Sequence, residues 1–273
     1  DGFRCAVGLG GRVRRCPLRA VAELSRRSVI PLRDANPVRR VPIVTIGLIV
    51  ACVAVFAYEL GTQSTGGDSA LEAMFRRYGL VPANLTAALS GHRADLGREL
   101  LTIPTSMFLH GGWLHLIGNM LYLWIFGNNI EDRLGRLRFL VFYLVGGFAA
   151  AATQVLIAPH SAVPVIGASG AIAAVLGAYL VLFPRARVLS LVFLGFFYQL
   201  LEVPALIVLG LWFVLQLIDG LASLGVESSA GGVALFEHIG GFILGVVVGL
   251  LLRTVTRRPP PRVAEPPSGF GVG

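Results

Sequence analysis

Lysine is absent from this chain, and charged residues of any kind are scarce. Only 14% of the 273 residues are charged, whereas 55% are hydrophobic. A typical soluble domain carries roughly 25% charged residues. The scarcity of charge therefore excludes an ordinary water-soluble globular domain, and it indicates a protein whose main solvent is lipid.

Cysteine is also rare, because only Cys5, Cys16 and Cys52 occur and all three lie near the N-terminus. Such a distribution does not support a disulfide framework. The formal net charge is +8, and every basic residue is Arg. These arginines lie in short segments between hydrophobic runs rather than in one patch with interleaved aromatic residues, so we expect no nucleic-acid partner.

Six hydrophobic runs approach or exceed the roughly 18 residues that cross a bilayer. They cover residues 41–60, 107–127, 139–158, 168–183, 203–223 and 237–252. Backbone polar groups have no water partner in lipid, so each run is expected to be a helix. A seventh apolar stretch, 189–201, is too short to span and is interpreted as an interfacial connection. The predicted fold class is all-α, a polytopic membrane bundle of six transmembrane helices.

The two ends of the chain differ from this hydrophobic region. Residues 1–29 are rich in Arg and contain no long apolar run, and the first Met is Met74. We expect this segment to be a disordered tail, or one that a non-AUG start at Val29 would remove. Residues 30–253 are predicted to form the membrane domain, and residues 254–273 an Arg- and Pro-rich cytoplasmic tail.

Arginine is distributed unevenly among the segments that join the six runs. Residues 1–40 carry ten Arg against three acidic residues, whereas residues 61–106 carry four of each sign. The segments 128–138 and 184–188 and the C-terminal tail are also rich in Arg, and all fall on the same side as residues 1–40 in a six-span topology. Cytoplasmic loops carry the excess of positive charge. Both termini are therefore predicted to be cytoplasmic.

A few polar side chains lie within the hydrophobic runs, where they are costly and invite a functional interpretation. In the second run, His115 and Asn119 are four residues apart and share one helix face. Ser169 begins the fourth run and His238 begins the sixth. Spans two, four and six run in the same direction across the membrane, so all of these side chains are expected at one depth, toward the outer face.

Small residues recur at every fourth position in the same two runs. Such faces allow the backbones of two helices to approach closely. The positions are Ser169, Ala173 and Gly177 in the fourth run, and Gly241, Gly245 and Gly249 in the sixth. If these faces meet, Ser169 and His238 come within hydrogen-bond reach.

This combination of side chains suits nucleophilic catalysis. A serine hydroxyl needs a base to take its proton, and histidine is the usual base. Attack on a peptide carbonyl creates an oxyanion, for which Asn119, His115 and the backbone N–H of Ser169 are candidate donors. No carboxylate is well placed to complete a triad, so a Ser169–His238 dyad is predicted.

Simpler interpretations exist for each of these residues taken alone. Ser169 would serve as a helix-packing residue, His238 as an interfacial side chain and Asn119 as a bond between helices. Trp212 in the fifth run is interpreted as a lipid-facing or packing residue. Only the conjunction of Ser169, His238, His115 and Asn119 at one depth favours catalysis.

Four motifs in order resemble those of the rhomboid family of intramembrane serine proteases, from about Ile30 to Arg253. They are His110-Gly111-Gly112-Trp113-Leu114-His115 with Asn119, Gly127 through Glu131-Asp132-Arg133-Leu134-Gly135, Gly167-Ala168-Ser169-Gly170, and His238-Ile239-Gly240-Gly241. The resemblance implies a six-helix core, Ser169 as nucleophile and His238 as base.

The same resemblance implies further roles and partners. His115 and Asn119 would stabilise the oxyanion, with His110, Gly167 and Gly241 in support. The substrates would be single-span membrane proteins, cut near the outer face of the plasma membrane without a metal or cofactor.

Departures from the family pattern include Arg98-Glu99-Leu100-Leu101, where a Trp-Arg pair is common, and two single positions. Ala173 stands where some members place an aromatic residue that supports the histidine ring, and Glu237 stands where a small residue is common.

Two functions other than proteolysis are compatible with a helical membrane protein of this size. A catalytically inactive relative that only binds membrane helices would lack the serine or the histidine, and both are present here. A small transporter would be expected to show inverted repeats, which the sequence does not show.

Overall fold

The computed structural model describes residues 29–34, 36, 38–91, 95–194, 197–223 and 234–255. Except for Val29, Thr254 and Val255, the two predicted tails lie outside the described residues. The elements follow in the order β1 (Val29–Asp34), α2 (Ile43–Tyr78), α3 (Pro82–Leu89), α4 (Leu96–Ser106), α5 (Trp113–Tyr122), the π-helix η1 (Leu123–Gly127), α6 (Asn128–Leu134), α7 (Arg136–Ile157), α8 (Ser169–Leu182), β2 (Arg187–Leu194), β3 (Phe197–Pro204), α9 (Ala205–Ser223) and α10 (Ala234–Val255).

The helical membrane bundle predicted from the sequence is confirmed. Within the described residues, three helices are long and apolar enough to cross a membrane, namely α2, α7 and residues 236–254 of α10. Two further apolar helices are shorter, Ser169–Leu182 and Ala205–Val214. The predicted second span, 107–127, contains α5 and η1, and α6 continues the helix into the segment that was predicted to connect the second and third spans. The count of six spans therefore stays a prediction.

Helix boundaries differ most from the prediction at the first two runs. The first helix, α2, continues to Tyr78 and contains one residue of non-helical conformation, Gly67, with φ 70°. Helix formers such as Ala70, Leu71 and Glu72 extend it after that point. The second run becomes helical only at Trp113 because Gly112, with φ 156°, has a non-helical conformation directly before the helix.

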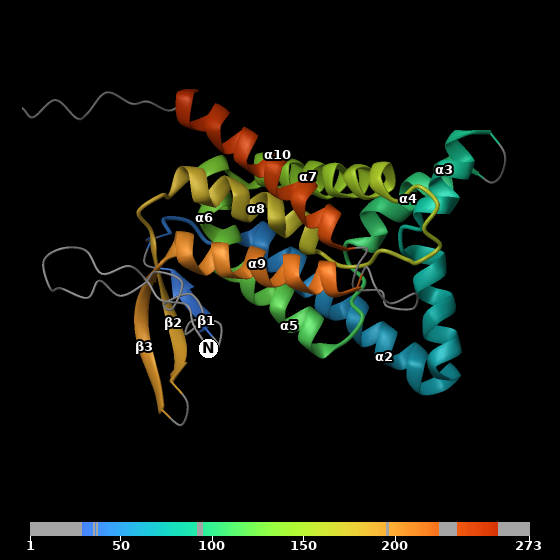
Figure 1. Cartoon of the computed structure of the whole chain (residues 1–273), viewed down its shortest axis with the longest axis horizontal. Coiled ribbons are helices and arrows are strands. Elements are labelled where there is room, and N and C mark those ends of the chain that lie inside the picture. Colours follow the sequence, from blue (N-terminus) through green and yellow to red (C-terminus); the bar gives the residue numbers. More distant parts are fainter. Residues whose placement is uncertain are drawn as a thin grey trace, which may run out of the picture.

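Helices α5, α8 and α10 begin at the same end of the bundle, as the direction of the predicted spans requires. The start of α8 is tied to the end of α4 by the hydrogen bond from Gly167 N–H to the Ser106 carbonyl, at 2.9 Å. The three-stranded sheet lies at the opposite end from α3 and α4 (Figure 1). The molecule therefore has one end built from helices and loops, and another covered by strands.

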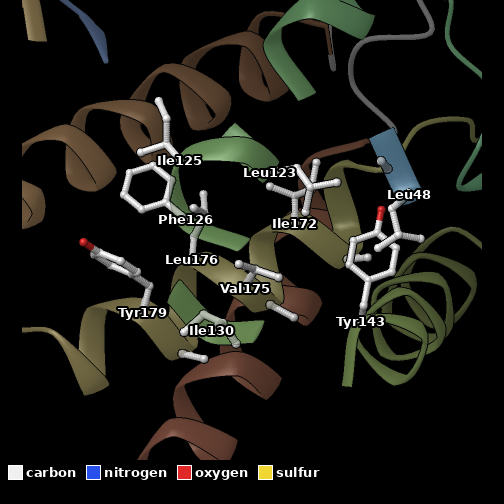
Figure 2. Packing of buried hydrophobic residues seen from close by; sticks show 14 of the residues in the cluster. Leu48, Leu123, Ile125, Phe126, Ile130, Tyr143, Ile172, Val175, Leu176 and Tyr179 are labelled. Carbon is white, nitrogen blue, oxygen red and sulfur yellow. The ribbon is translucent and has the colours of Figure 1, made fainter. Parts of the chain in front are cut away.

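Helix α8 is the centre of the core. Every residue from Ser169 to Tyr179 is buried, because the helix is apolar on all sides. Ile172, Val175 and Leu176 of α8 face side chains of other helices, among them Phe126 and Tyr143, which point toward a common centre (Figure 2). A helix surrounded in this way holds its first residue, Ser169, in a fixed position.

Glu131 of α6 caps the first membrane helix. Its carboxylate accepts hydrogen bonds from the backbone N–H groups of Val44 and Thr45, at 3.0 and 2.8 Å, and from the Thr45 hydroxyl, at 2.8 Å. The first N–H groups of a helix lack partners within it, and the helix dipole favours a negative charge there. Glu131 of the 128–138 segment thus stabilises the fold.

The predicted interfacial connection at 189–201 is a β-hairpin, so the chain is not purely helical. Strands β2 and β3 pair antiparallel, with Arg187 opposite Pro204, and β1 adds to the other edge of β2 in the order β1-β2-β3. The hairpin strands contain β-branched residues, including Val188 and Val203, that favour extended backbone. Apolar content alone did not distinguish this segment from an irregular one, and the pairing depends on β1, which lies far away in sequence.

A buried carboxylate fastens β1 to the helices. Asp34 Oδ2 accepts hydrogen bonds from Asn129 Nδ2 at 2.7 Å, from the Tyr179 hydroxyl at 2.9 Å and from Asn36 Nδ2 at 3.1 Å. Burial raises the pKa of Asp34 above its ordinary value, and these hydrogen bonds partly oppose the shift. The network joins the sheet to α6 and to the end of α8.

Candidate active site

Ser169 is the first residue of α8 and is buried, with 7% of its surface exposed. The loop before it ends in Gly167, whose φ of 126° is rarely adopted by other residues. Backbone N–H groups in the first turn of a helix have no partner within the helix. The serine hydroxyl therefore lies beside the first backbone N–H groups of α8, at the positive end of its helix dipole.

Helices α8 and α10 approach one another through the small residues predicted from the sequence. A methyl group built on Gly241 would overlap the Gly170 carbonyl oxygen, and one built on Gly245 would overlap the Ala174 carbonyl oxygen. His238 lies three residues before Gly241, on nearly the same face of α10. The close approach therefore brings the buried His238 side chain to the start of α8.

We expect Gly245→Val to separate these two helices. The added side chain would collide with the Ala174 backbone, which cannot move aside as a flexible side chain would. Overpacking of this kind costs about 1–3 kcal/mol or more.

Thermal unfolding in detergent can be followed by the reaction of a thiol probe with the buried Cys52, after Cys5 and Cys16 are replaced by Ser. The control is Gly210→Val, because nothing lies within 4 Å of a side chain added there. Equal melting temperatures would contradict this packing.

His115 reaches the same place from α5. A methyl group built on Gly167 would lie 2.8 Å from His115 Nε2 and 3.6 Å from Ser169 Oγ, so both side chains flank Gly167. His115 and His238 are also close enough to interact electrostatically. Gly167 has to be glycine for two reasons, its backbone conformation and the absence of room for a side chain.

Asn119 lies one helical turn after His115 and is buried, with 8% of its surface exposed. Its Nδ2 has no hydrogen-bond partner among the described residues. A buried donor without a partner is costly, so the protein keeps it at the expense of stability. Such a donor is suited to a ligand atom that carries negative charge.

His110 lies beside His115 in the segment that precedes α5. Its backbone N–H donates to Glu59 Oε1 of α2 at 3.0 Å, and its Nδ1 lies 3.1 Å from the Phe108 carbonyl oxygen. The His110 and His115 rings lie 5.2 Å apart at an interplanar angle of 64°. The motif that begins at His110 therefore fixes the loop before α5.

Neither ring nitrogen of His238 has a hydrogen-bond partner among the described residues, so Ser169 and His238 are not hydrogen-bonded in this structure. Glu237 does not contact His238 through a hydrogen bond either. Its carboxylate Oε1 points toward α8, 2.6 Å from the position of a methyl group built on Gly170. The described residues thus show no third member of a triad, and they show no group of three metal-ligating side chains.

The sequence interpretation missed one residue of the site, Trp212 of α9. Its ring lies 5.6 Å from the His238 ring and 5.9 Å from the Tyr122 ring of α5. Trp212 is half-buried, and these ring contacts agree with the packing alternative of the sequence interpretation. No signal in the sequence placed it beside His238, because hydropathy does not distinguish the faces of an apolar helix.

The model of the rhomboid domain matches residues 97–255, more than half of the chain. The chain belongs to the rhomboid family. The matched part of this rhomboid protein begins in α4 and ends in α10, and it contains Ser169, His238, His115 and Asn119. The family assignment made from the four sequence motifs is therefore confirmed.

Known relatives include one that is named as a protease and one that is named as inactive. The rhomboid protease GluP of Bacillus subtilis is 34% identical over 154 residues, 56% of this chain and 27% of the relative. Rhomboid protein 1, mitochondrial, of Saccharomyces cerevisiae is 30% identical over 159 residues, 57% of this chain and 42% of the relative. Inactive rhomboid protein 1 of Drosophila melanogaster is 29% identical over 84 residues, 31% of this chain and 6% of the relative. The matches span less than half the length of these relatives.

Proposed function

We propose that this rhomboid protein is a serine endopeptidase that cleaves single-span membrane proteins within the bilayer, near its outer face. The observation that carries the proposal is the meeting of three helix starts: Ser169 on α8, His238 on α10 and His115 on α5. Membership of a family that includes a named protease supports it. No part of the proposed chemistry needs a metal or a cofactor.

On this proposal, His238 takes the proton of the Ser169 hydroxyl as Oγ attacks the substrate carbonyl carbon. The carbonyl oxygen becomes an oxyanion, which Asn119 Nδ2, His115 and the backbone N–H of Ser169 stabilise. The C–N bond then breaks, the amine takes the proton from His238, and an acyl-enzyme remains. A water molecule, activated by His238, cleaves the ester and restores Ser169.

The proposed topology has six spans in the plasma membrane, with both termini in the cytoplasm. In this arrangement α2, α5 with η1 and α6, α7, α8, α9 and α10 alternate in direction, and the sheet faces the cytoplasm. Arg40, Arg136 and Arg187 lie near the strands and the helix ends next to them, in agreement with the positive-inside rule. Residues 30–253 are the proposed membrane domain, flanked by the tails 1–29 and 254–273.

A second candidate function is the binding of membrane helices without cleavage. Two observations favour it: His238 has no hydrogen bond to Ser169 in this structure, and one relative is named as inactive. Catalytic hydrogen bonds are often absent from free enzymes and form with substrate. We prefer the protease for that reason.

Cleavage of a membrane reporter tests the proposal. The purified full-length protein in liposomes would be incubated with a single-span reporter that has Gly and Pro in the outer part of its span, and the products mapped by mass spectrometry. We expect a single cut in that region, because an easily unwound helix exposes its carbonyl groups. The control reporter replaces Gly and Pro by Leu and should be cut more slowly. A protein that binds the first reporter and leaves it intact would favour the second candidate.

A further inference from the structure

Hydrogen bonds do not hold the His238 ring in this structure. The side chain is buried, with 3% of its surface exposed, yet both ring nitrogens lack partners among the described residues. A base can act only if its ring stays in the orientation that faces the nucleophile. Packing contacts therefore have to provide what a hydrogen-bonded carboxylate would otherwise provide.

The neighbouring position on α8 offers no ring for this purpose. Ala173 lies one turn after Ser169 and faces Gly241 of α10. Both residues are small, which allows the two helices to approach closely, but neither can cover the face of an imidazole. The support for His238 has to come from another helix.

Trp212 of α9 supplies that contact. Its ring lies 5.6 Å from the His238 ring at an interplanar angle of 51°. The Trp212 ring also lies 5.9 Å from the Tyr122 ring at 41°, and the Tyr122 ring in turn lies 5.9 Å from the Phe126 ring. Phe126 is fully buried in the core. The row of rings Phe126, Tyr122, Trp212 and His238 therefore connects the rigid core to the histidine.

We propose that Trp212 is a positioning residue that holds the His238 ring in its catalytic orientation. The inference rests on the proposed function, in which His238 is the base. When His238 has taken the proton of Ser169 it is an imidazolium, and a Trp ring attracts a cation at this separation. Trp212 thus favours the charged transition state as well as the orientation of the ring.

The position of α9 determines whether the Trp212 ring lies beside His238. Helix α9 contacts α10 through Trp212 and also through Phe213, whose ring lies 5.6 Å from Phe242. A displacement of α9 would remove Trp212 from His238 and leave the base without its ring contact. The orientation of His238 therefore depends on the position of α9.

Three variants of the full-length protein test this inference. Trp212→Leu removes the ring beside His238, Trp212→Phe keeps a smaller ring, and Phe213→Leu is the matched control that removes a ring contact between α9 and α10 without touching His238. Each would be assayed for kcat and KM on the membrane reporter and for the labelling rate of Ser169 by a fluorophosphonate. The probe is small and enters without a transmembrane segment, so it separates the orientation of the base from substrate entry.

We expect Trp212→Leu to lower kcat and the labelling rate roughly tenfold, with KM changed by less than about twofold. Trp212→Phe should keep most of the rate, and Phe213→Leu nearly all of it. NMR of protein labelled at the histidine rings should show that the His238 signal, assigned by its loss in His238→Ala, moves in Trp212→Leu and stays in place in Phe213→Leu.

Equal labelling rates in Trp212→Leu and Phe213→Leu, with the His238 signal unmoved, would overturn the inference and leave the proposed function intact. A change in KM alone would also overturn it, because Trp212 would then act only on substrate entry. A wild-type protein that neither cuts the reporter nor takes up the probe would overturn the proposed function itself, and the positioning role with it.

Discussion

Replacing either Ser169 or His238 by alanine is expected to lower cleavage and fluorophosphonate labelling by roughly 10⁴-fold or more. Without Ser169 there is no nucleophile, and without His238 its hydroxyl keeps its proton near pH 7. Because the two side chains act as one unit, the double variant should be no slower than either single variant. The measurements are the rate of reporter cleavage in liposomes and the identity of the labelled residue by mass spectrometry.

Matched substitutions outside the site serve as controls. Ser190 is a buried serine in β2, where its hydroxyl donates to the Val188 carbonyl, and His160 is an exposed histidine in the loop after α7. Ser190→Ala and His160→Ala should keep wild-type activity. A Ser169→Ala variant that still cuts the reporter, or a His238→Ala variant that still takes up the probe, would rule out the proposed dyad.

Hydropathy and spacing predicted much of the bundle because both depend on residues that are near one another in sequence. The helices α7, α8, α9 and α10 begin and end within a few residues of the predicted runs. The small residues Gly241 and Gly245 predicted which helices meet, since only small side chains permit the backbone contact that the structure contains.

Features that depend on distant pairs escaped prediction. The hairpin of β2 and β3 is completed by β1, which lies more than 150 residues earlier in the chain. The carboxylate of Glu131 caps a helix that begins 88 residues before it, at Ile43. Trp212 looks like any apolar residue of a membrane helix until its neighbours are known. In each case the partner, and not the residue itself, determines the role.

The candidate site was predicted in its composition but not in its internal contacts. The sequence indicated that Ser169, His238 and His115 share one depth, and the structure brings their helices together. The sequence also indicated that Glu237 points roughly 100° away from His238 around the helix, but not that its carboxylate would lie against Gly170 of α8. A rotation of roughly 100° per residue separates neighbouring side chains on a helix, so the acidic residue next to the histidine faces a different helix.

Asn119→Ala is expected to lower kcat by roughly 10²- to 10³-fold and to leave KM nearly unchanged. The amide would bind the oxyanion, which exists only in the transition state and the tetrahedral intermediate, so its loss should not affect the binding of the uncleaved substrate. Some activity should remain, because His115 and the backbone N–H of Ser169 still donate. The measurement is reporter cleavage at several substrate concentrations in liposomes.

The stability of the same variant separates this role from a structural one. Asn119 Nδ2 has no hydrogen-bond partner among the described residues, so its removal breaks no hydrogen bond of this amide donor there, and the melting temperature should stay the same or rise. Asn129→Ala is the matched control, because Asn129 donates to the buried Asp34 at 2.7 Å. That variant should melt at a lower temperature and keep its kcat when assayed below it. If Asn119→Ala instead lowers the melting temperature and leaves kcat intact, Asn119 joins helices, and the oxyanion has to be stabilised by His115 and the α8 backbone alone.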